Sequence, residues 1–184
     1  SQTKTYPVDV PLTMLFGDLP ITDIKVSTDE KTFFNDSVSS EHSFKETLKN
    51  VLQHPTVASK SFLITIGDRT VGGMVARDQF IGPYQVPVSD YSMSLRSFTS
   101  SGGEVLTIGE KPTIAINNPA ASMRMAMAEA LLNMSGVYIK GLDEVQVSAN
   151  WMAATGEGVE DLSLRDGVEA LSECCVSLNI SVPV

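Results

Sequence analysis

The chain has few residues of the kinds that bridge small proteins covalently or bind metals through sulfur. Its only cysteines, Cys174 and Cys175, are adjacent. On a helix, neighbouring side chains point about 100° apart, which disfavours a disulfide between them. No CxxC spacing predicts a zinc site, and the two histidines, His42 and His54, share no motif with each other or with an acid. The sequence therefore argues against a disulfide framework and against a cysteine–histidine metal centre.

Basic residues and long apolar runs are also scarce. Thirteen Lys and Arg face 22 Asp and Glu, giving a formal net charge of −9, which argues against a nucleic-acid-binding surface. An acidic chain can still bind an anion, because Mg²⁺ can link carboxylates to phosphates. No apolar run approaches the ~18 residues of a membrane span, and no signal peptide is recognised. We expect a cytoplasmic protein with neither a nucleic-acid nor a membrane partner.

Familiar catalytic motifs are missing as well. The chain has no P-loop, no GxGxxG pattern and no Ser-His-Asp arrangement, and core packing explains the two cysteines better than a nucleophilic role. It has instead a glycine-rich stretch from Phe62 to Asp90. Glycine permits positive φ or close approach of the backbone to a ligand, so this stretch is a candidate binding loop. Its glycines are Gly67, Gly72, Gly73 and Gly82.

Hydrophobic periodicity and capping residues predict three helices. The first begins with a capping box formed by Ser43 and Glu46. The second, which has the strongest pattern, begins with Asn118 as its cap and Pro119 at its first position. The predicted helices span residues 43–53, 118–134 and 162–178.

Short apolar or alternating runs predict strands between these helices. They cover residues 62–66, 90–98, 105–108, 113–116, 145–149 and 180–184. Strands in the middle and helices around them predict an α+β domain, with a mixed β-sheet and helices packed on one face. The prolines of YPVDVPLTMLFGDLP are typical of an extended arm, so residues 1–40 are interpreted as an arm or linker and residues 41–184 as the domain.

Two polar residues on the second predicted helix suggest a metal site. Glu129 and Asn133 are four positions apart and therefore lie on one side of the helix. Carboxylate and amide oxygens suit a hard cation such as Mg²⁺, and Asp90 is a candidate for a third ligand. From spacing alone, an ordinary solvated helix flank is the better interpretation.

Other charged residues allow two interpretations each. Lys60 either meets a nucleotide or, as is more common, points into solvent. A group of loop charges forms either a ligand-binding cluster or ordinary ion pairs, and spacing favours the ion pairs. These charges are Asp68, Arg69, Arg77 and Asp78.

Several long motifs resemble one family. The stretch HPTVASKSFLITIGDRTVGGMVARDQFIGPYQVPVSDYSMSL is similar to phosphoribosylformylglycinamidine synthase in its large, single-chain form, as are GEVLTIGE, RMAMAEALLNMSG and VQVSANWMAATGEGVEDLSLRDGVEAL. The motif YPVDVPLTMLFGDLP resembles the segment that leads into this domain in the family. The resemblance implies the N-terminal subdomain of the second half of the synthetase region. Each half resembles aminoimidazole ribonucleotide synthase, so we expect the fold of that enzyme's N-terminal domain.

The resemblance also implies a reaction. The family converts formylglycinamide ribonucleotide to formylglycinamidine ribonucleotide in purine biosynthesis, consuming ATP and glutamine and requiring Mg²⁺. The first synthetase half, the following subdomain and the glutaminase domain have no counterpart here, so we expect a fragment that is inactive alone and is cut at Val184. A natural end at Val184 would favour a stand-alone dimerisation or nucleotide-binding module. A separate kinase-like protein is disfavoured, because no phosphate loop or general base is found.

Site residues and partners follow from the same resemblance. It implies that the full-length enzyme holds an auxiliary ATP or ADP with Mg²⁺, with metal ligands Asp90, Glu129 and Asn133 and nucleotide contacts Lys60, Leu63 and Ser89. In this fragment we expect that binding to be weak or absent, because the following subdomain supplies part of the pocket. The implied partner is the rest of the polypeptide. Equivalent subdomains pair their sheets in this family, so we also expect the fragment to form a homodimer that covers the sheet face bearing Met93, Leu95 and Val105.

Overall fold

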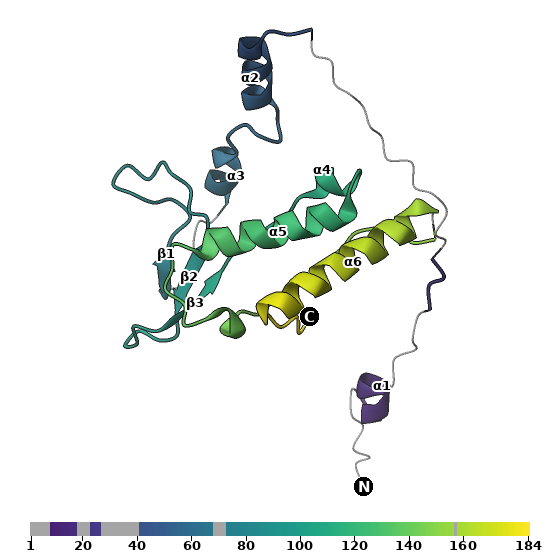
Figure 1. The fold of residues 1–184 in the computed structure, drawn as a ribbon. Coiled ribbons are helices and arrows are strands. Elements are labelled where there is room, and N and C mark those ends of the chain that lie inside the picture. Colours follow the sequence, from purple (N-terminus) through teal and green to yellow (C-terminus); the bar gives the residue numbers. More distant parts are fainter. Residues whose placement is uncertain (1–7, 18–22, 27–40, 68–72, 157) are drawn as a thin grey trace.

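The computed structural model describes residues 8–17, 23–26, 41–67, 73–156 and 158–184. Two long helices, α5 (Pro119–Met134) and α6 (Val159–Leu178), lie side by side and make the most extensive contact between elements. A small antiparallel sheet lies beside the C-terminal end of α5 (Figure 1). This arrangement confirms the predicted α+β class.

The two long helices begin and end where local chemistry favours it. Asn118 Oδ1 accepts a hydrogen bond from the Ala121 N–H at 2.9 Å, and Pro119 occupies the first turn of α5. These contacts confirm the predicted cap. Helix α6 ends at Asn179, which adopts a left-handed conformation with φ 56°, a conformation that asparagine tolerates better than most residues.

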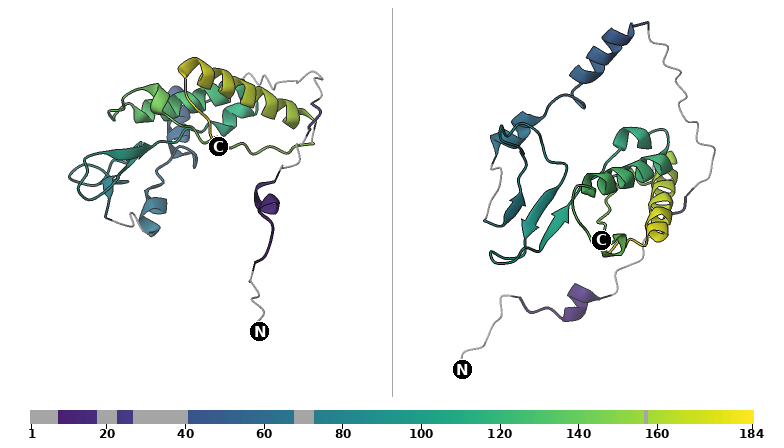
Figure 2. Two further views of the ribbon diagram at one scale, coloured as in Figure 1. Left: turned by 90° about the horizontal axis from the view of Figure 1, so that it is seen from below. Right: turned by 60° about the vertical axis from the view of Figure 1, so that its left-hand side comes forward.

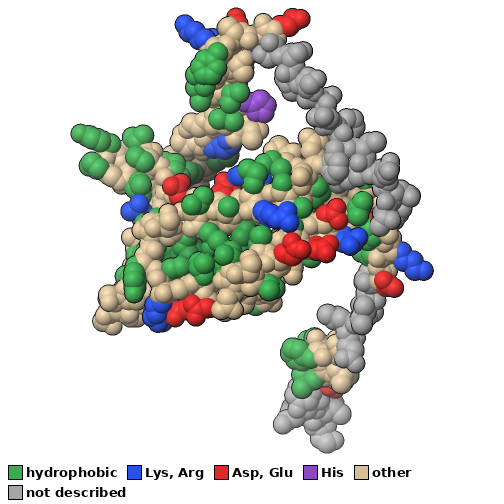
Figure 3. Space-filling model, viewed as in Figure 1, with side chains coloured by type: hydrophobic (Ala, Val, Ile, Leu, Met, Phe, Trp, Pro, Cys, Tyr) green, Lys and Arg blue, Asp and Glu red, His purple; other side chains and the backbone are tan. Residues whose placement is uncertain are grey.

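The hydrophobic core lies where α5 and α6 meet two extended segments, residues 145–151 and 180–184. Its buried residues are Met127, Leu171, Cys175 and Ile180. Packing therefore accounts for Cys175, and burial raises the pKa of its thiol. On the outer face, apolar side chains of α5 and α6 adjoin charged ones (Figure 3), and the Arg124–Glu173 pair joins the two helices at 3.4 Å.

The two extended segments run parallel without forming full strands. A single parallel bridge joins Gln146 to Ser181. The Val147 N–H donates to the Ser181 carbonyl and the Ala149 N–H to the Val184 carbonyl, each at 2.9 Å. The predicted strands at residues 145–149 and 180–184 are therefore extended chain joined by a few bonds.

The sheet contains β1 (Val75–Arg77), β2 (Ser92–Leu95) and β3 (Gly103–Leu106), in the order β1-β2-β3. Both pairings are antiparallel, so the prediction of a mixed sheet is wrong. The predicted strands at residues 90–98 and 105–108 exist in shorter or shifted form. Helices α5 and α6 lie mainly against each other, and the sheet projects from their end (Figures 1 and 2), so the predicted cover of helices over one sheet face is not observed.

Two predicted strands are helices instead. Residues 62–66 belong to α3 (Ser61–Ile66), and residues 113–116 largely to α4 (Pro112–Ala115). Short apolar runs do not distinguish strand from buried helix by periodicity. In α4, Pro112 presets a helical φ at the first position. A short 3₁₀ turn, η1 (Leu142–Glu144), follows α5.

Two helices near the N-terminus project from the core (Figure 2). The capping box predicted for α2 (Phe44–Gln53) is confirmed, since Ser43 Oγ accepts from the Glu46 N–H and Glu46 Oε2 accepts from the Ser43 N–H. Helix α1 (Leu12–Phe16) lies within the predicted arm, so this part of it is helical. The boundary at residue 40 stays a prediction. Within the described ranges, no helix has the length and apolarity to cross a membrane.

Candidate functional site

The 108–111 segment, between β3 and α4, lies directly against α5. Gly109 makes the closest approach, because a Cβ at this position would overlap the carbonyl oxygen of Ala126. Ser122 on α5 is fully buried and donates its Oγ–H to the carbonyl oxygen of Lys111 at 2.6 Å. The path of the segment is therefore held by contacts between its backbone and the helix.

Glu129 and Asn133, the predicted α5 ligands, both face this segment. Glu129 Oε2 accepts a hydrogen bond from the Glu110 N–H at 2.9 Å, and Oε1 pairs with Lys111 Nζ at 2.6 Å. Asn133 Nδ2 donates to the Ile108 carbonyl at 3.1 Å. The Oδ1 atom of Asn133 takes no part in that bond. The two side chains share one side of α5, as predicted. They are half-buried and make tertiary contacts, unlike a plain solvated flank.

The surroundings of Glu129 favour its charged form. The hydrogen bond from Lys111 is the main reason that the pKa of this carboxyl lies below its ordinary value, and the bond from the Glu110 N–H acts in the same direction. The carboxylate is thus ionised at neutral pH. Its negative charge, which a metal ligand needs, is balanced here by the Lys111 ammonium.

A hollow of about 840 Å³ at the sheet brings together three of the predicted residues, Ser89, Asp90 and Asn133. Ser89 is held on two sides, since its Oγ–H donates to the Tyr91 carbonyl at 2.6 Å and its Oγ accepts from Arg77 Nε at 3.3 Å. The Arg77 guanidinium also lies over the Tyr91 ring, 5.0 Å from its centroid. This hollow offers a carboxylate and an amide to a ligand, whereas the Ser89 hydroxyl is engaged by Arg77 and by the Tyr91 backbone.

The other two predicted nucleotide contacts lie on or beside α3. Lys60 Nζ donates to the Thr56 carbonyl at 2.8 Å and to the Ala58 carbonyl at 3.0 Å. Leu63 is exposed. Neither Lys60 nor Leu63 lines the sheet hollow. Their roles stay predictions.

The four charged residues of the glycine-rich stretch are not all described by the structure. Asp68 and Arg69 lie outside the described residues. Arg77 contacts Ser89 and Tyr91, and Asp78 accepts a hydrogen bond from the Gln79 N–H at 2.7 Å. Both Arg77 and Asp78 line the sheet hollow. They therefore lie at the candidate site, which the interpretation as ordinary loop ion pairs did not predict.

The oxygen atoms of Asp90, Glu129 and Asn133 are of the kind that binds a hard cation. The Glu129 carboxylate, however, is already paired with Lys111. In the described part of the chain, no cluster of three or more His, Cys, Asp or Glu side chains could hold a metal. The predicted set differs from such a cluster, since it has two carboxylates and one amide. Asp90 and Asn133 open to the same hollow, whereas Glu129 does not line it and is paired with Lys111. Mg²⁺ accepts such oxygen donors and completes its shell with water.

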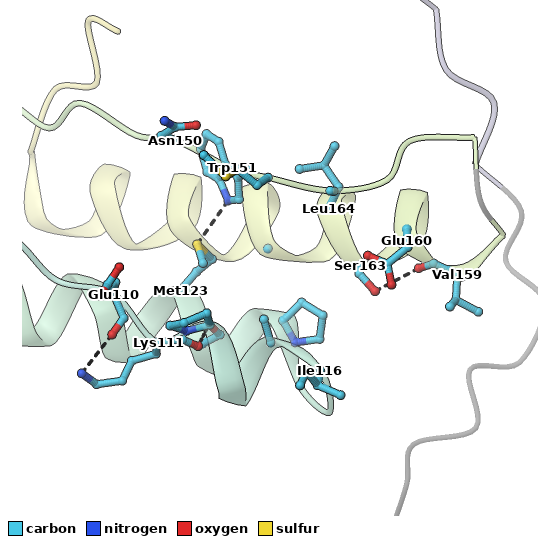
Figure 4. Close-up of a pocket in the computed structure, with 17 residues that line it drawn as sticks. Glu110, Lys111, Ile116, Met123, Asn150, Trp151, Val159, Glu160, Ser163 and Leu164 are labelled. Atoms are coloured by element: carbon cyan, nitrogen blue, oxygen red, sulfur yellow. Dashed lines mark hydrogen bonds between the residues drawn. The ribbon is translucent and has the colours of Figure 1, made fainter. Parts of the chain in front are cut away.

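A second hollow, of about 750 Å³, lies between α4, α5, α6 and residues 150–153 (Figure 4). Trp151 forms part of its wall and donates its indole N–H to Met123 Sδ at 3.2 Å. Glu110 and Lys111 also line it. Sequence reasoning missed this hollow, because its walls come from segments that are far apart in the chain.

The fold and the facing polar groups define a small α+β domain with oxygen donors gathered around the 108–111 segment and the sheet. A family model described as the FGAR-AT PurM_N-like domain matches residues 59–184, well over half of the chain. The chain therefore belongs to the FGAR-AT PurM_N-like domain family, a domain of phosphoribosylformylglycinamidine synthase (FGAM synthase). The match includes all six predicted site residues, and α1 and α2 precede it.

Proposed function

We propose that the chain contributes an auxiliary Mg²⁺–nucleotide site and an interface between subdomains to FGAM synthase. In this proposal the enzyme is the glutamine- and ATP-dependent ligase that forms formylglycinamidine ribonucleotide, in the cytoplasm. The chain carries no catalytic residue of its own and is inactive alone. Its partners are the remaining domains of the same polypeptide.

One observation carries the proposal. Within the matched domain, Ser89, Asp90 and Asn133 line a single hollow, although residues 90 and 133 are far apart in the sequence. The carboxylate and the amide come from separate parts of the chain and face one cavity. Oxygen donors of these two kinds are the ligands that a divalent cation such as Mg²⁺ uses.

The proposed division of roles follows the chemistry of the side chains. Oxygens of Asp90, Glu129 and Asn133 would hold Mg²⁺, and Ser89 would meet the nucleotide beside it. Lys60 and Leu63, on or beside α3, would contact the nucleotide as well. When bound, Mg²⁺ supplies the positive charge that lets this acidic domain accept phosphate oxygens.

Calorimetry tests the proposal. We expect the complete synthase polypeptide that contains this domain to bind ADP in the presence of Mg²⁺, and Asp90→Asn or Glu129→Gln to weaken binding by roughly tenfold or more, as loss of a metal ligand does. Asp143→Asn, an exposed acid of η1, is the matched control and should bind normally. Normal binding with both Asp90 and Glu129 replaced would show that the site is misassigned.

A further inference from the structure

Arg77 is a half-buried cation whose contacts are with uncharged groups. Its Nε–H donates to Ser89 Oγ at 3.3 Å, and its guanidinium lies over the Tyr91 ring, 5.0 Å from the centroid. Among the residues that the structure describes, the ion pairs join other side chains. No carboxylate of the described chain therefore balances the positive charge of Arg77.

Two contacts hold the guanidinium and leave its outer edge available. The Tyr91 ring supports one face, and Ser89 Oγ accepts the Nε–H. Ser89 Oγ is itself fixed, since its O–H donates to the Tyr91 carbonyl at 2.6 Å and its oxygen accepts from the Tyr91 N–H at 3.4 Å. A guanidinium has five N–H donors, and the four on the Nη atoms have no acceptor in the described part of the chain. An edge held in this way suits an oxyanion, which accepts two parallel N–H bonds.

Arg77 lies beside the proposed metal ligands. It contacts Ser89 and Tyr91, the residues on either side of Asp90 in the chain. All four line the sheet hollow of about 840 Å³, as does Asn133. Arg77 is the only lysine or arginine among the described residues that line it. An anion in this hollow therefore has one basic side chain to contact.

The other charges of the hollow narrow the kind of anion. Asp78, Asp90 and Glu104 also line it, so a bare anion is repelled. A divalent cation on Asp90 offsets that repulsion and favours an anion that bridges the cation and the guanidinium. Phosphate groups are the usual ligands of sites that combine arginine with Mg²⁺. The chemistry therefore indicates a polyphosphate that binds together with a divalent cation.

We propose that Arg77 binds the phosphate groups of the nucleotide in the sheet hollow. Its Nη–H groups donate to phosphoryl oxygens, and Mg²⁺ on Asp90 and Asn133 balances the remaining phosphate charge. The Ser89 hydroxyl and the Tyr91 ring hold the guanidinium in place. This inference rests on the proposed function. It adds a residue that the proposed function does not include, and it names the polyphosphate chain as the part of the ligand that the hollow recognises.

Calorimetry with ADP and Mg²⁺ on the complete synthase polypeptide provides the first test. The quantity of interest is the ADP binding that Asp90→Asn weakens. We expect Arg77→Gln to weaken it roughly tenfold, as loss of a hydrogen bond between charged groups does. Arg77→Lys keeps the charge but loses the planar fork, so it should restore only part of the affinity. Arg96→Gln is the matched control, because it removes the same charge from an exposed residue outside the hollow and should bind normally.

A ligand series distinguishes a phosphate contact from a structural role. We expect the loss in Arg77→Gln to be large for ADP, smaller for AMP and absent for adenosine, because the guanidinium meets only phosphate groups. Equal losses for all three ligands would show that Arg77 merely supports the fold of the site, and the inference would be wrong. Displacement of ADP by an equal concentration of pyrophosphate with Mg²⁺ would overturn the nucleotide as the occupant.

The outcomes separate this inference from the proposed function. Normal ADP binding in Arg77→Gln, with binding still weakened in Asp90→Asn, overturns the role of Arg77 and leaves the metal ligands standing. Binding that Arg77→Gln weakens and Asp90→Asn does not supports the phosphate contact and overturns Asp90 as a metal ligand. A wild-type polypeptide that does not bind ADP overturns both.

A second measurement needs no variant. Phenylglyoxal modifies arginine side chains, and mass spectrometry of the resulting peptides identifies each modified residue. In the wild-type polypeptide, ADP with Mg²⁺ should protect Arg77 from modification and leave Arg96 as reactive as before. An Arg77 that reacts equally with and without saturating ADP would show that it does not contact the nucleotide, and the inference would be wrong even if Arg77→Gln fails to fold.

Discussion

At the scale of single residues, the charge of Glu129 is the clearest determinant of the candidate site. Its spacing from Asn133 predicted that the two would share one side of α5. Its pairing with Lys111 could not be predicted, because the two residues are 18 positions apart and meet only through the path of the 108–111 segment along α5. That path depends on Gly109, whose tertiary contact leaves no signature in local sequence.

The Glu129 interaction should give the chain a pH-dependent stability. The pKa of this carboxyl in the folded chain lies below the ordinary value of 4.5. A group whose pKa is lowered by folding stabilises the fold above its unfolded pKa, and that contribution is lost as the pH falls through its folded pKa. We therefore expect the gap between the urea midpoints of wild type and Glu129→Gln to be widest near pH 7 and to shrink below about pH 4.5.

Combining the replacement with Lys111→Met provides the control. Because Lys111 is the main cause of the low pKa, replacing Glu129 in a Lys111→Met chain should have a smaller pH-dependent effect. An equal effect in both backgrounds would show that another group sets the charge of Glu129.

At the scale of elements, the three long helices could be predicted from the sequence, whereas the short helices and strands could not. Helices α2, α5 and α6 are ten or more residues long, and α2 and α5 also begin with a side-chain cap. Residues 62–66 are mostly apolar and include β-branched residues, yet they form α3, where Thr65 Oγ1 donates to the Ser61 carbonyl at 3.1 Å. Five residues are too few for a pattern to decide between strand and helix.

The contact between the 108–111 segment and α5 leads to a prediction about packing. Gly109→Ala would place a methyl group against the backbone of α5 at Ala126, where no flexible side chain can yield. We expect a loss of about 1–3 kcal/mol in the free energy of unfolding, as in other overpacked sites. Urea denaturation followed by circular dichroism measures it. Gly102→Ala is the control, because its Cβ would lie 3.4 Å from Ser100 Oγ, and a similar loss there would contradict the packing argument.

At the scale of the whole molecule, the sheet has a half-buried apolar face formed by Met93, Leu95 and Val105. Met93 pairs with Val105 across β2 and β3, and Leu95 lies on the same face. Along the described chain, β3 pairs with β2 alone. The expectation of a homodimer through this face came from the family resemblance, and the projection of the sheet from the helices (Figure 2) supports it as a proposal.

Sedimentation velocity at micromolar concentration tests the dimer. We expect a dimer in the wild type and a monomer in Val105→Lys, because a buried charge costs more than a small interface of roughly 800 Å² per partner can offset. Leu106→Lys, at an exposed position on the opposite face of the sheet, should leave the dimer intact. A wild-type chain that sediments only as monomer would rule the dimer out.

The contact between Trp151 and Met123 has a practical consequence. Trp151 is the only tryptophan of the chain, and its indole N–H rests on the Met123 sulfur at the wall of the second hollow. The tryptophan fluorescence of the protein therefore comes from one indole at a known place. Any change there would alter the emission of this single tryptophan, so the unmodified chain carries its own optical probe of that cavity.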